Sequence, residues 1–251
     1  PIDKKPWEPG VTFSTRAHLQ SAVFGQLLNF DINYKITPGI IKSWRWEEKT
    51  KSYILTVDST LKFAKGRSVR PTDVEFAILK NFLSKNEEAD RRVFTDIKGI
   101  DALKIGQKFK SGMCEGLKVV GKDQLRVFLK RRNPVFLYIL GDLTSFVAPV
   151  EDFNSDYFTF NRTPRGRGKY EIIWTSPDDS LVRLKRKKDY QEEGADYPLT
   201  IDFFGHGSAL DNKADIAIGA GTRGIDEKSS GYSFLSNPVP RIVQVIDFNY
   251  S

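Results

Sequence analysis

Residues 219–224, Gly-Ala-Gly-Thr-Arg-Gly, have the spacing G-x-G-x-x-G that dinucleotide-binding proteins place directly after a strand. In those proteins the glycines let the backbone approach a pyrophosphate at the N-terminus of a helix. Such a site therefore requires a helix directly after the glycines. Residues 225–233 instead contain Gly231, Ser229 and Ser230, without apolar periodicity. We interpret the segment as a glycine-rich loop, and we expect no cofactor.

Histidine and cysteine, which often serve as bases, nucleophiles and metal ligands, are scarce. His206 lies two residues before Ser208, but the segment lacks the G-x-S-x-G pattern of a nucleophile elbow. Cys114 is the only cysteine, and no neighbouring motif would lower the pKa of its thiol, so we expect a small buried residue. His18 is the only other histidine, which leaves too few ligands for a transition-metal site. We predict neither catalysis nor a metal centre.

Two helices have clear signals. The first is capped by Ser14 or Thr15 and carries an apolar stripe of Leu19, Ala22, Val23 and Leu27. The second has Pro71 at its first position and a capping box of Thr72 with Glu75. Its buried stripe consists of Val74, Ala77, Ile78 and Phe82. Residues 84–92 are polar and predict a loop after this helix.

Alternating apolar residues predict several strands between these helices and after them. Residues 52–57 form one strand, and residues 117–130 form a hairpin that turns at Gly121. Residues 170–174 and 181–185 make a second hairpin. Further strands are expected at 201–204, 215–218 and 242–248, and residues 31–38 are expected to be a polar loop. The fold class is therefore α/β or mixed α+β.

The chain is basic, with 39 Lys+Arg against 32 Asp+Glu and a net charge of +7. Many of the cations lie between residues 162 and 188, near Tyr170 and Trp174, a combination that nucleic-acid binders also show. The alternative is a solvated strand edge, where lysines discourage pairing with another chain. We favour the strand edge, because no nucleic-acid-binding motif accompanies the charge. No apolar run approaches the ~20 residues of a membrane helix.

An ordered set of segments resembles bacterial extracellular solute-binding proteins of family 5, which serve oligopeptide and dipeptide importers. Residues 36–44 resemble the family's "PG-hydrophobic-A-x-x-W" segment, and residues 68–76 its helix opening "T-A-x-D-V-x-F". Residues 165–170 stand where the family has "G-T-G-P-Y". The other matching segments are 27–31, 46–66, 119–137, 147–149, 181–190, 209–217 and 248–249. Lys65, Asp58 and Lys169 depart from the pattern, which indicates a divergent member.

The resemblance implies a periplasmic-binding-protein-like lobe of type II, cluster C. We expect a discontinuous main lobe, residues 1–24 plus 149–251, with a small α/β domain inserted at 25–148. A second, C-terminal lobe should begin just past Ser251. The start at Pro1 without a methionine favours a processed or cut chain over a complete cytoplasmic protein, and by the resemblance we expect that a signal peptide was removed. The protein would then be periplasmic or anchored at the cell surface as a lipoprotein.

By the same resemblance, the protein captures peptides or similar small solutes and delivers them to an ABC permease, without catalysis or nucleic-acid binding. A basic nucleic-acid-binding or other non-transport ligand-sensing module is the alternative. The expected ligand contacts are Thr12, Phe13, Ser14 and Thr15 before the first helix, and Arg91 and Phe94 in residues 91–95. The family counterpart of Trp44 is buried, so we expect a buried Trp44. Without its second lobe, the chain should bind ligand weakly and self-associate.

Overall fold

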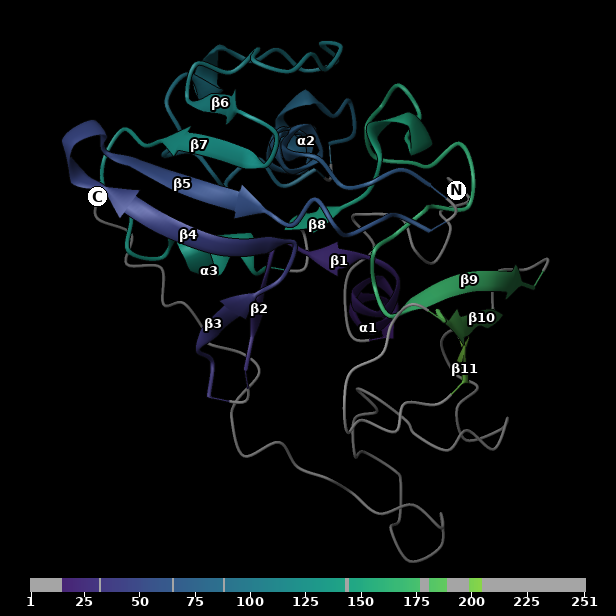
Figure 1. Ribbon diagram of the computed structural model, residues 1–251. Helices are drawn as coiled ribbons and strands as arrows, with labels where there is room; N and C mark the ends of the chain where they lie inside the picture. The colour runs from purple at the N-terminus through teal and green to yellow at the C-terminus, as the bar shows by residue number, and fades with distance from the viewer. Residues whose placement is uncertain are drawn as a thin grey trace, which may run out of the picture. The chain divides into compact units, whose positions relative to one another are not determined.

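The computed structural model describes residues 15–31, 33–64, 66–87, 89–142, 145–176, 181–188 and 199–204. Its α-helices are α1 (Thr15–Val23), α2 (Pro71–Leu83) and α3 (Phe136–Leu140). Short 3-10 helices lie at η1 (Glu48–Thr50), η2 (Ile100–Ala102) and η4 (Val150–Asp152). Together with antiparallel strands these elements make a mixed α/β chain, as the sequence predicts (Figure 1). No helix among the described residues is long and apolar enough to cross a membrane.

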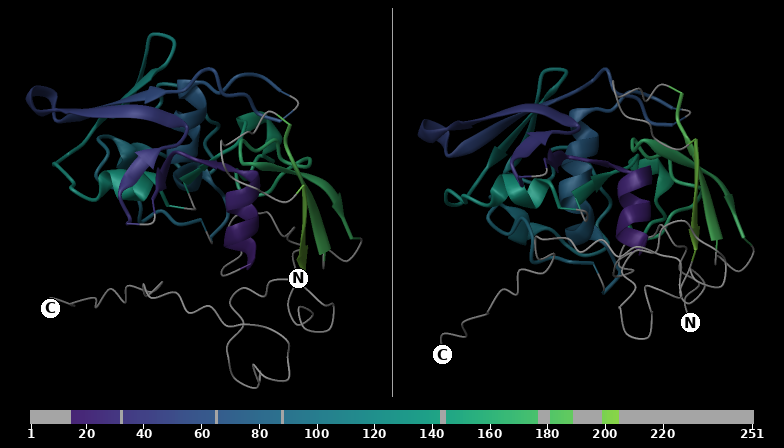
Figure 2. Two further views of the ribbon diagram at one scale, coloured as in Figure 1. Left: turned by 60° about the horizontal axis from the view of Figure 1, so that its bottom comes forward. Right: turned by 90° about the horizontal axis from the view of Figure 1, so that it is seen from below.

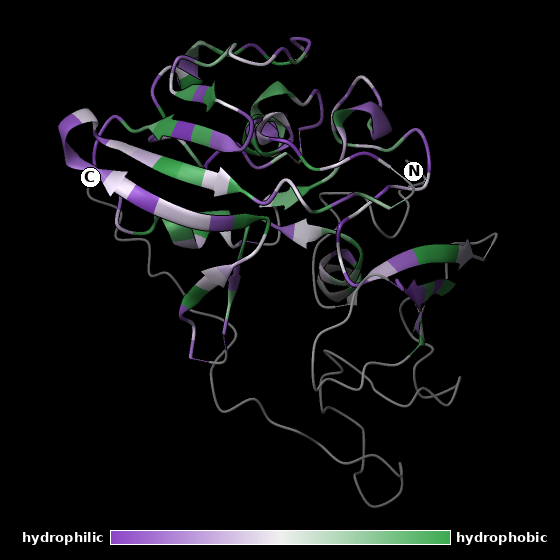
Figure 3. Cartoon of the chain, in the orientation of Figure 1, coloured by the Kyte–Doolittle hydropathy of each residue, from purple (hydrophilic) through white to green (hydrophobic). Residues whose placement is uncertain are grey.

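The larger sheet contains β4 (Ile41–Glu47), β5 (Ser52–Val57), β7 (Gln124–Phe128) and β6 (Leu117–Val120), in that order. All neighbouring strands are antiparallel. Buried and partly exposed residues alternate along β7, and the residues of this strand alternate in hydropathy (Figure 3). Gly121, in the turn between β6 and β7, has a φ of 62°, a value that favours glycine. The predicted strand at 52–57 and the hairpin at 117–130 are confirmed.

Helix α2 begins at Pro71, as predicted, but its N-terminus is capped differently. Asp73 Oδ2 accepts a hydrogen bond from the backbone N–H of Arg70 at 2.8 Å. The capping box of Thr72 with Glu75 is therefore wrong. Glu75 lies two residues beyond Asp73, which holds the capping position, and its carboxylate is buried and bonded to Ser111 instead.

Residues 28–38 form a hairpin rather than the polar loop expected for residues 31–38. β2 (Leu28–Phe30) pairs with β3 (Ile36–Pro38), and only residues 31–35 turn the chain. Asp31 Oδ1 stabilises this turn by accepting backbone hydrogen bonds from Asn33 at 2.8 Å and Lys35 at 2.9 Å. Each strand is only three residues long, too short for alternation to be visible in the sequence.

A second sheet contains β9 (Tyr170–Thr175), β10 (Leu181–Arg186) and β11 (Thr200–Phe204), in the order β11-β10-β9. The predicted second hairpin is therefore confirmed. The basic strand β10 is the central strand of this described sheet, so its interpretation as a strand edge is wrong; its exposed cations are Arg183 and Lys185, which alternate with the buried Val182 and Leu184. Helix α1 packs against β9 and β11 (Figure 2). The predicted strands at 215–218 and 242–248 lie outside the described residues.

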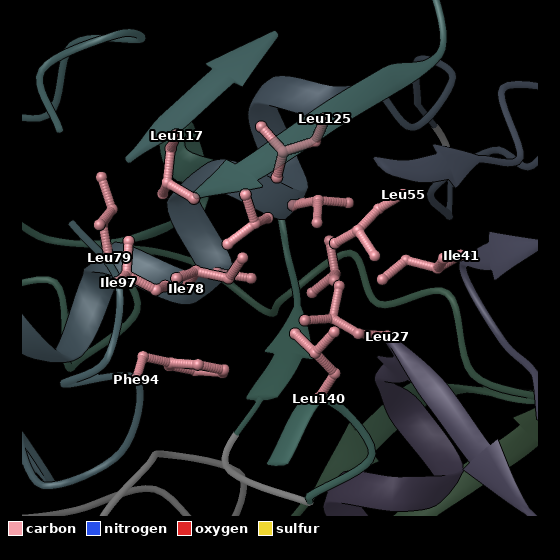
Figure 4. Close-up of a cluster of buried hydrophobic side chains, with 14 of the residues drawn as sticks. Leu27, Ile41, Leu55, Ile78, Leu79, Phe94, Ile97, Leu117, Leu125 and Leu140 are labelled. Atoms are coloured by element: carbon pink, nitrogen blue, oxygen red, sulfur yellow. The ribbon is translucent and has the colours of Figure 1, made fainter. Parts of the chain in front are cut away.

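The buried side chains form two clusters. The first, here called the aliphatic cluster, packs between α2 and the larger sheet (Figure 4). Its members come from residues 27–147 and include Leu27, Ile41, Leu55, Ile78, Leu79, Leu117, Leu125 and Leu140. The second, the aromatic cluster, combines α1 with residues 146–153 and the second sheet. It contains Leu19, Val23, Phe24, Phe76, Phe146, Ala148, Phe153, Tyr170, Val182 and Leu184.

Two residues differ from their expected places around the aliphatic cluster. Leu27, predicted on the stripe of the first helix, lies beyond the end of α1 at Val23 and is buried in the aliphatic cluster. Trp44, expected to be buried, is only partly buried at the margin of this cluster. The reason is its position on β4, which is the outermost strand of the described sheet on that side.

Candidate functional site

The loop after α2 holds Arg91, one of the expected ligand contacts. Its Nη2 donates hydrogen bonds to the carbonyl oxygens of Ser84 at 2.6 Å and Asn86 at 3.0 Å. Its Nε is buried and has no hydrogen-bond partner among the residues that the structure describes. Arg91 therefore holds the loop through its Nη2, and the residue as a whole remains only partly buried.

The loop is tied to Asp156, which lies 72 residues after Ser84 along the sequence. Ser84 Oγ donates to the carbonyl oxygen of Asp156 at 2.8 Å, and the backbone N–H of Lys85 donates to the same oxygen at 3.2 Å. Ser84 is fully buried. The position of Arg91 is thus set by contacts on both sides of the loop.

Phe94, the second expected contact in this segment, is a core residue. Its side chain is 4% exposed, and its ring packs edge-on against that of Phe136, with centroids 6.1 Å apart. Its backbone has a φ of 61°, a conformation that costs free energy in a residue other than glycine. The surrounding structure must therefore hold the backbone of Phe94 in place.

The residues after Phe94 supply that anchoring. Ile97 forms an isolated antiparallel bridge with Leu129, directly after β7. The carboxylate of Asp96 accepts hydrogen bonds from Asn133 Nδ2 at 2.9 Å and Arg131 Nε at 3.1 Å. The segment that carries Arg91 and Phe94 is therefore joined firmly to the larger sheet.

The other expected contacts precede α1. Thr12, Phe13 and Ser14 lie outside the described residues. Thr15 is the first residue of α1 and does not precede it. Of the expected contacts, the structure describes the side chains of Arg91 and Phe94 alone.

A buried carboxylate lies near Cys114, and the sequence patterns do not identify it. Glu75 on α2 accepts hydrogen bonds from Ser111 Oγ at 2.6 Å and from the backbone N–H of Gly112 at 2.7 Å. Burial raises the pKa of Glu75, although these two bonds oppose the shift. Burial also raises the pKa of the Cys114 thiol, opposite to what a nucleophile needs. Cys114 is therefore the small buried residue that was expected.

A network of charges joins the start of α2 to η4. Arg67 donates to both carboxylate oxygens of Asp73, at 2.6 and 2.7 Å, and to Glu151 at 3.1 Å. Arg165 donates to Asp152 at 2.7 Å and to Glu151 at 3.3 Å. Such bidentate contacts are typical of structural ion pairs.

Other cations of the basic segment at 162–188 are also engaged within the chain. Arg183 makes two bonds of 2.7 Å with the carboxylate of Asp202 on the neighbouring strand. Lys187 is buried and donates to the carbonyl oxygen of Gly166 at 2.7 Å. These contacts give the basic residues a structural role without a nucleic acid.

The remaining residues that could act as metal ligands, bases or nucleophiles form no site in the part of the chain that the structure describes. No group of His, Cys, Asp and Glu among the described residues could hold a metal ion. His206, Ser208 and the glycine-rich residues 219–224 lie outside the described ranges. His18 lies within α1, where only its backbone is described.

Two solved structures define the class of fold. The pheromone receptor PrgZ, described with its mode of peptide binding, superimposes with a TM-score of 0.67 at 16% identity, over 80% of this chain and 40% of its own. The substrate-binding domain of an oligopeptide ABC transporter from Bacillus anthracis gives 0.60 at 20% identity, over 80% and 40%. The described fold is therefore that of one lobe of a periplasmic binding protein.

The family follows from the sequence match. Residues 35–209 match the family described as bacterial extracellular solute-binding proteins, family 5 Middle. The chain belongs to this family, whose members are binding proteins. A curated relative, the nickel-binding periplasmic protein of Escherichia coli (strain K12), is 23% identical over 204 residues. That match covers 80% of this chain but only 36% of the relative.

Proposed function

We propose that this chain is part of the substrate-binding component of an ABC importer, which captures peptides or similar small solutes outside the cytoplasm for a membrane permease. The family match over residues 35–209 is the observation that carries this proposal. The peptide-binding pheromone receptor and the oligopeptide transporter favour a peptide ligand. The nickel-binding relative makes a nickel complex the second ligand to test. The protein acts by binding and release, without turnover.

We also propose that residues 1–24 and 149–251 form the main lobe and residues 25–148 an inserted domain. The separation of the two hydrophobic clusters supports this division. The aliphatic cluster draws its members from residues 27–147, whereas most of the aromatic cluster lies outside that range. In this arrangement β1 (Gly25–Gln26) and β8 (Phe146–Val147), which pair with each other, are the two crossings between the parts.

In this proposal Arg91 contacts the ligand directly, together with Thr12, Phe13, Ser14 and Thr15. Arg91 is only partly buried, and its guanidinium group suits a carbonyl or carboxylate oxygen of a peptide. Phe94 is assigned a supporting role, because its ring is buried against Phe136. It fixes the backbone of the loop from which Arg91 extends.

Titration calorimetry with mixed di- to pentapeptides, and separately with nickel chelates, tests the ligand class. Small-ligand sites usually bury ~70–90% of the ligand surface, which in a two-lobed receptor requires both walls. We expect millimolar affinity for this chain alone and self-association in light scattering. Extension by a second lobe should restore tight binding. Sub-micromolar affinity of this chain alone would contradict the division into two lobes.

Two arginines of one loop provide a matched test of the contact. In the two-lobed protein, Arg91→Met should weaken binding by about tenfold, the typical loss of one charge-assisted hydrogen bond. Arg92→Met is the control, because the Arg92 side chain is 91% exposed and pairs with Asp90 nearby. Equal affinities of the two variants would remove Arg91 from the site.

Generic duplex DNA should not bind to the chain. Tight, salt-sensitive binding of DNA that is lost in Lys185→Glu would instead favour a nucleic-acid binder.

A further inference from the structure

Helix α2 lies between the two hydrophobic clusters and carries a buried lysine. Val74 and Ile78 belong to the aliphatic cluster, whereas Phe76 belongs to the aromatic cluster. Lys80 is four residues after Phe76, so both side chains leave the helix on the same face. The side chain of Lys80 is 1% exposed. Its position among apolar residues requires an explanation.

The amine of Lys80 reaches β8. Its Nζ donates to the carbonyl oxygen of Phe146 at 3.4 Å and lies 4.1 Å from the centroid of the Phe146 ring. That ring stacks on Phe24 at 4.3 Å, next to the end of α1. Strand β8 pairs with β1, which follows Phe24 directly. Lys80 thus contacts the two-stranded ribbon through which the chain passes between the clusters.

The charge of Lys80 is costly in this position. Burial lowers the pKa of Lys80 to about 7, against an ordinary value of 10.5. The carboxylate of Asp142, after α3, opposes this shift. Asp142 is the charged group that acts on Lys80 from the described elements around it. A neutral amine can still donate to the Phe146 carbonyl oxygen, but it no longer has to be desolvated as an ion.

We propose that Lys80 is a proton-controlled latch that closes the contact between α2 and the β1–β8 ribbon when the amine is neutral and loosens it when the amine is protonated. An opened contact exposes the amine to water, where it takes up a proton with an ordinary affinity. Between about pH 7 and 10.5 the open state therefore binds more protons than the closed state, and acidification favours opening. Below about pH 7 both states are protonated, and the effect levels off.

Hydrogen exchange of the full chain, corrected for intrinsic rates, tests the latch. In the unaltered protein the opening equilibrium of segments 24–27 and 145–149 should rise more than about tenfold from pH 8.5 to 6. Lys80→Met keeps the length of the side chain without a charge and should abolish this rise. Lys85→Met, which replaces an exposed lysine just after α2, should retain it. The β6–β7 hairpin should show no comparable change in any variant.

Equal pH dependence in Lys80→Met and the unaltered chain would overturn the proposal. If Lys80→Met does not fold, the proposal is tested on the unaltered chain. The pKa of Lys80 is then measured by NMR on a chain whose lysine side chains are labelled with 13C. A midpoint near 7 supports the latch. A midpoint above about 10, the ordinary lysine range, overturns it.

Discussion

The aliphatic cluster and the aromatic cluster share α2 but are assembled from the chain in different ways. Of the buried members among the described residues, four of 25 in the aliphatic cluster are aromatic, against five of ten in the aromatic cluster. The aliphatic cluster is built by hairpins and helices that follow one another between residues 27 and 147. The aromatic cluster brings together α1, Phe76, residues 146–153 and the second sheet.

This difference predicts that truncating a side chain lowers the free energy of unfolding by different amounts in the two clusters. A cluster of many small contributions loses little when one side chain is shortened, whereas a few large rings each support several others. Contacts between distant segments also form late, because the loop between them must first be closed. We therefore expect the aromatic cluster to be the more fragile part of the described chain.

Phe76→Ala should have the largest effect. The Phe76 ring meets those of Phe109, Phe153 and Tyr157 edge-on, at 5.1, 5.3 and 5.3 Å. Removing a fully buried phenylalanine typically costs about 3–5 kcal/mol. Urea unfolding measures the loss, and hydrogen exchange should show β9 losing protection while β5 keeps it.

Phe30→Ala is the control, because Phe30 is 37% exposed and belongs to neither cluster. It should change the free energy of unfolding by less than about 1 kcal/mol. Equal loss of protection in β5 and β9 after Phe76→Ala would show that the two clusters unfold as one unit.

Trp44→Ala tests the margin of the aliphatic cluster. A buried tryptophan would cost about 3–5 kcal/mol on truncation, but Trp44 is only partly buried, so we expect about 2 kcal/mol. Arg45→Ala is the matched control on the same strand, since the Arg45 side chain is 67% exposed. It should cost less than about 0.5 kcal/mol. A loss of 4 kcal/mol for Trp44→Ala would mean that the ring is covered in solution.

Arg67→Met should lower the free energy of unfolding least of the three substitutions, by about 1–2 kcal/mol. It should weaken the contact between α2 and η4. The variant leaves the nearly buried Asp73 without its bidentate partner. Burial raises the pKa of Glu151, but the hydrogen bond and charge of Arg67 outweigh it, so this pKa lies below 4.5. The resulting stability is present above pH 4.5 and is lost as the pH falls through the lowered pKa.

The acid side of a stability–pH curve checks this prediction. The unaltered chain should lose more stability than Arg67→Met on acidification below about pH 4.5. Lys122→Met, which replaces an exposed lysine in the turn between β6 and β7, should show the same loss of stability on acidification as the unaltered chain. If Arg67→Met also followed it, the charge network would not contribute to the contact between α2 and η4.

The sequence predicts those helices and strands that have a recognisable pattern within a few neighbouring residues. Pro71 with its apolar stripe identifies α2, and alternation identifies β5 and the β6–β7 hairpin. Strands β1 and β8 are two residues each and pair across about 120 intervening residues, so no local pattern can reveal them. β2 and β3 are missed for the same reason of length.

The candidate site was accessible to sequence reasoning only through the family resemblance. No local signal marks Arg91, because its role depends on carbonyl groups that the fold brings to it. Glu75 and Lys80 lie off the predicted stripe of Val74, Ala77, Ile78 and Phe82, at positions where a charged residue is ordinarily exposed, yet both are buried. The helix is covered on more than one face, which its local pattern does not reveal.

The packing of residues 166–168 against α1 has a consequence for how the protein is made. A Cβ on Gly166 would lie 1.9 Å from the carbonyl oxygen of Val23, and one on Gly168 2.1 Å from that of Ala22. The backbone N–H of Gly168 donates a hydrogen bond to the carbonyl oxygen of Val23 at 2.8 Å and so completes the last turn of α1. On a ribosome that adds ~5–20 residues per second, this partner emerges roughly 7–30 seconds after the helix. During that interval Leu19 and Val23 lack the second sheet, the part of their cluster that is synthesised last, and we expect the nascent chain to be a substrate for chaperones.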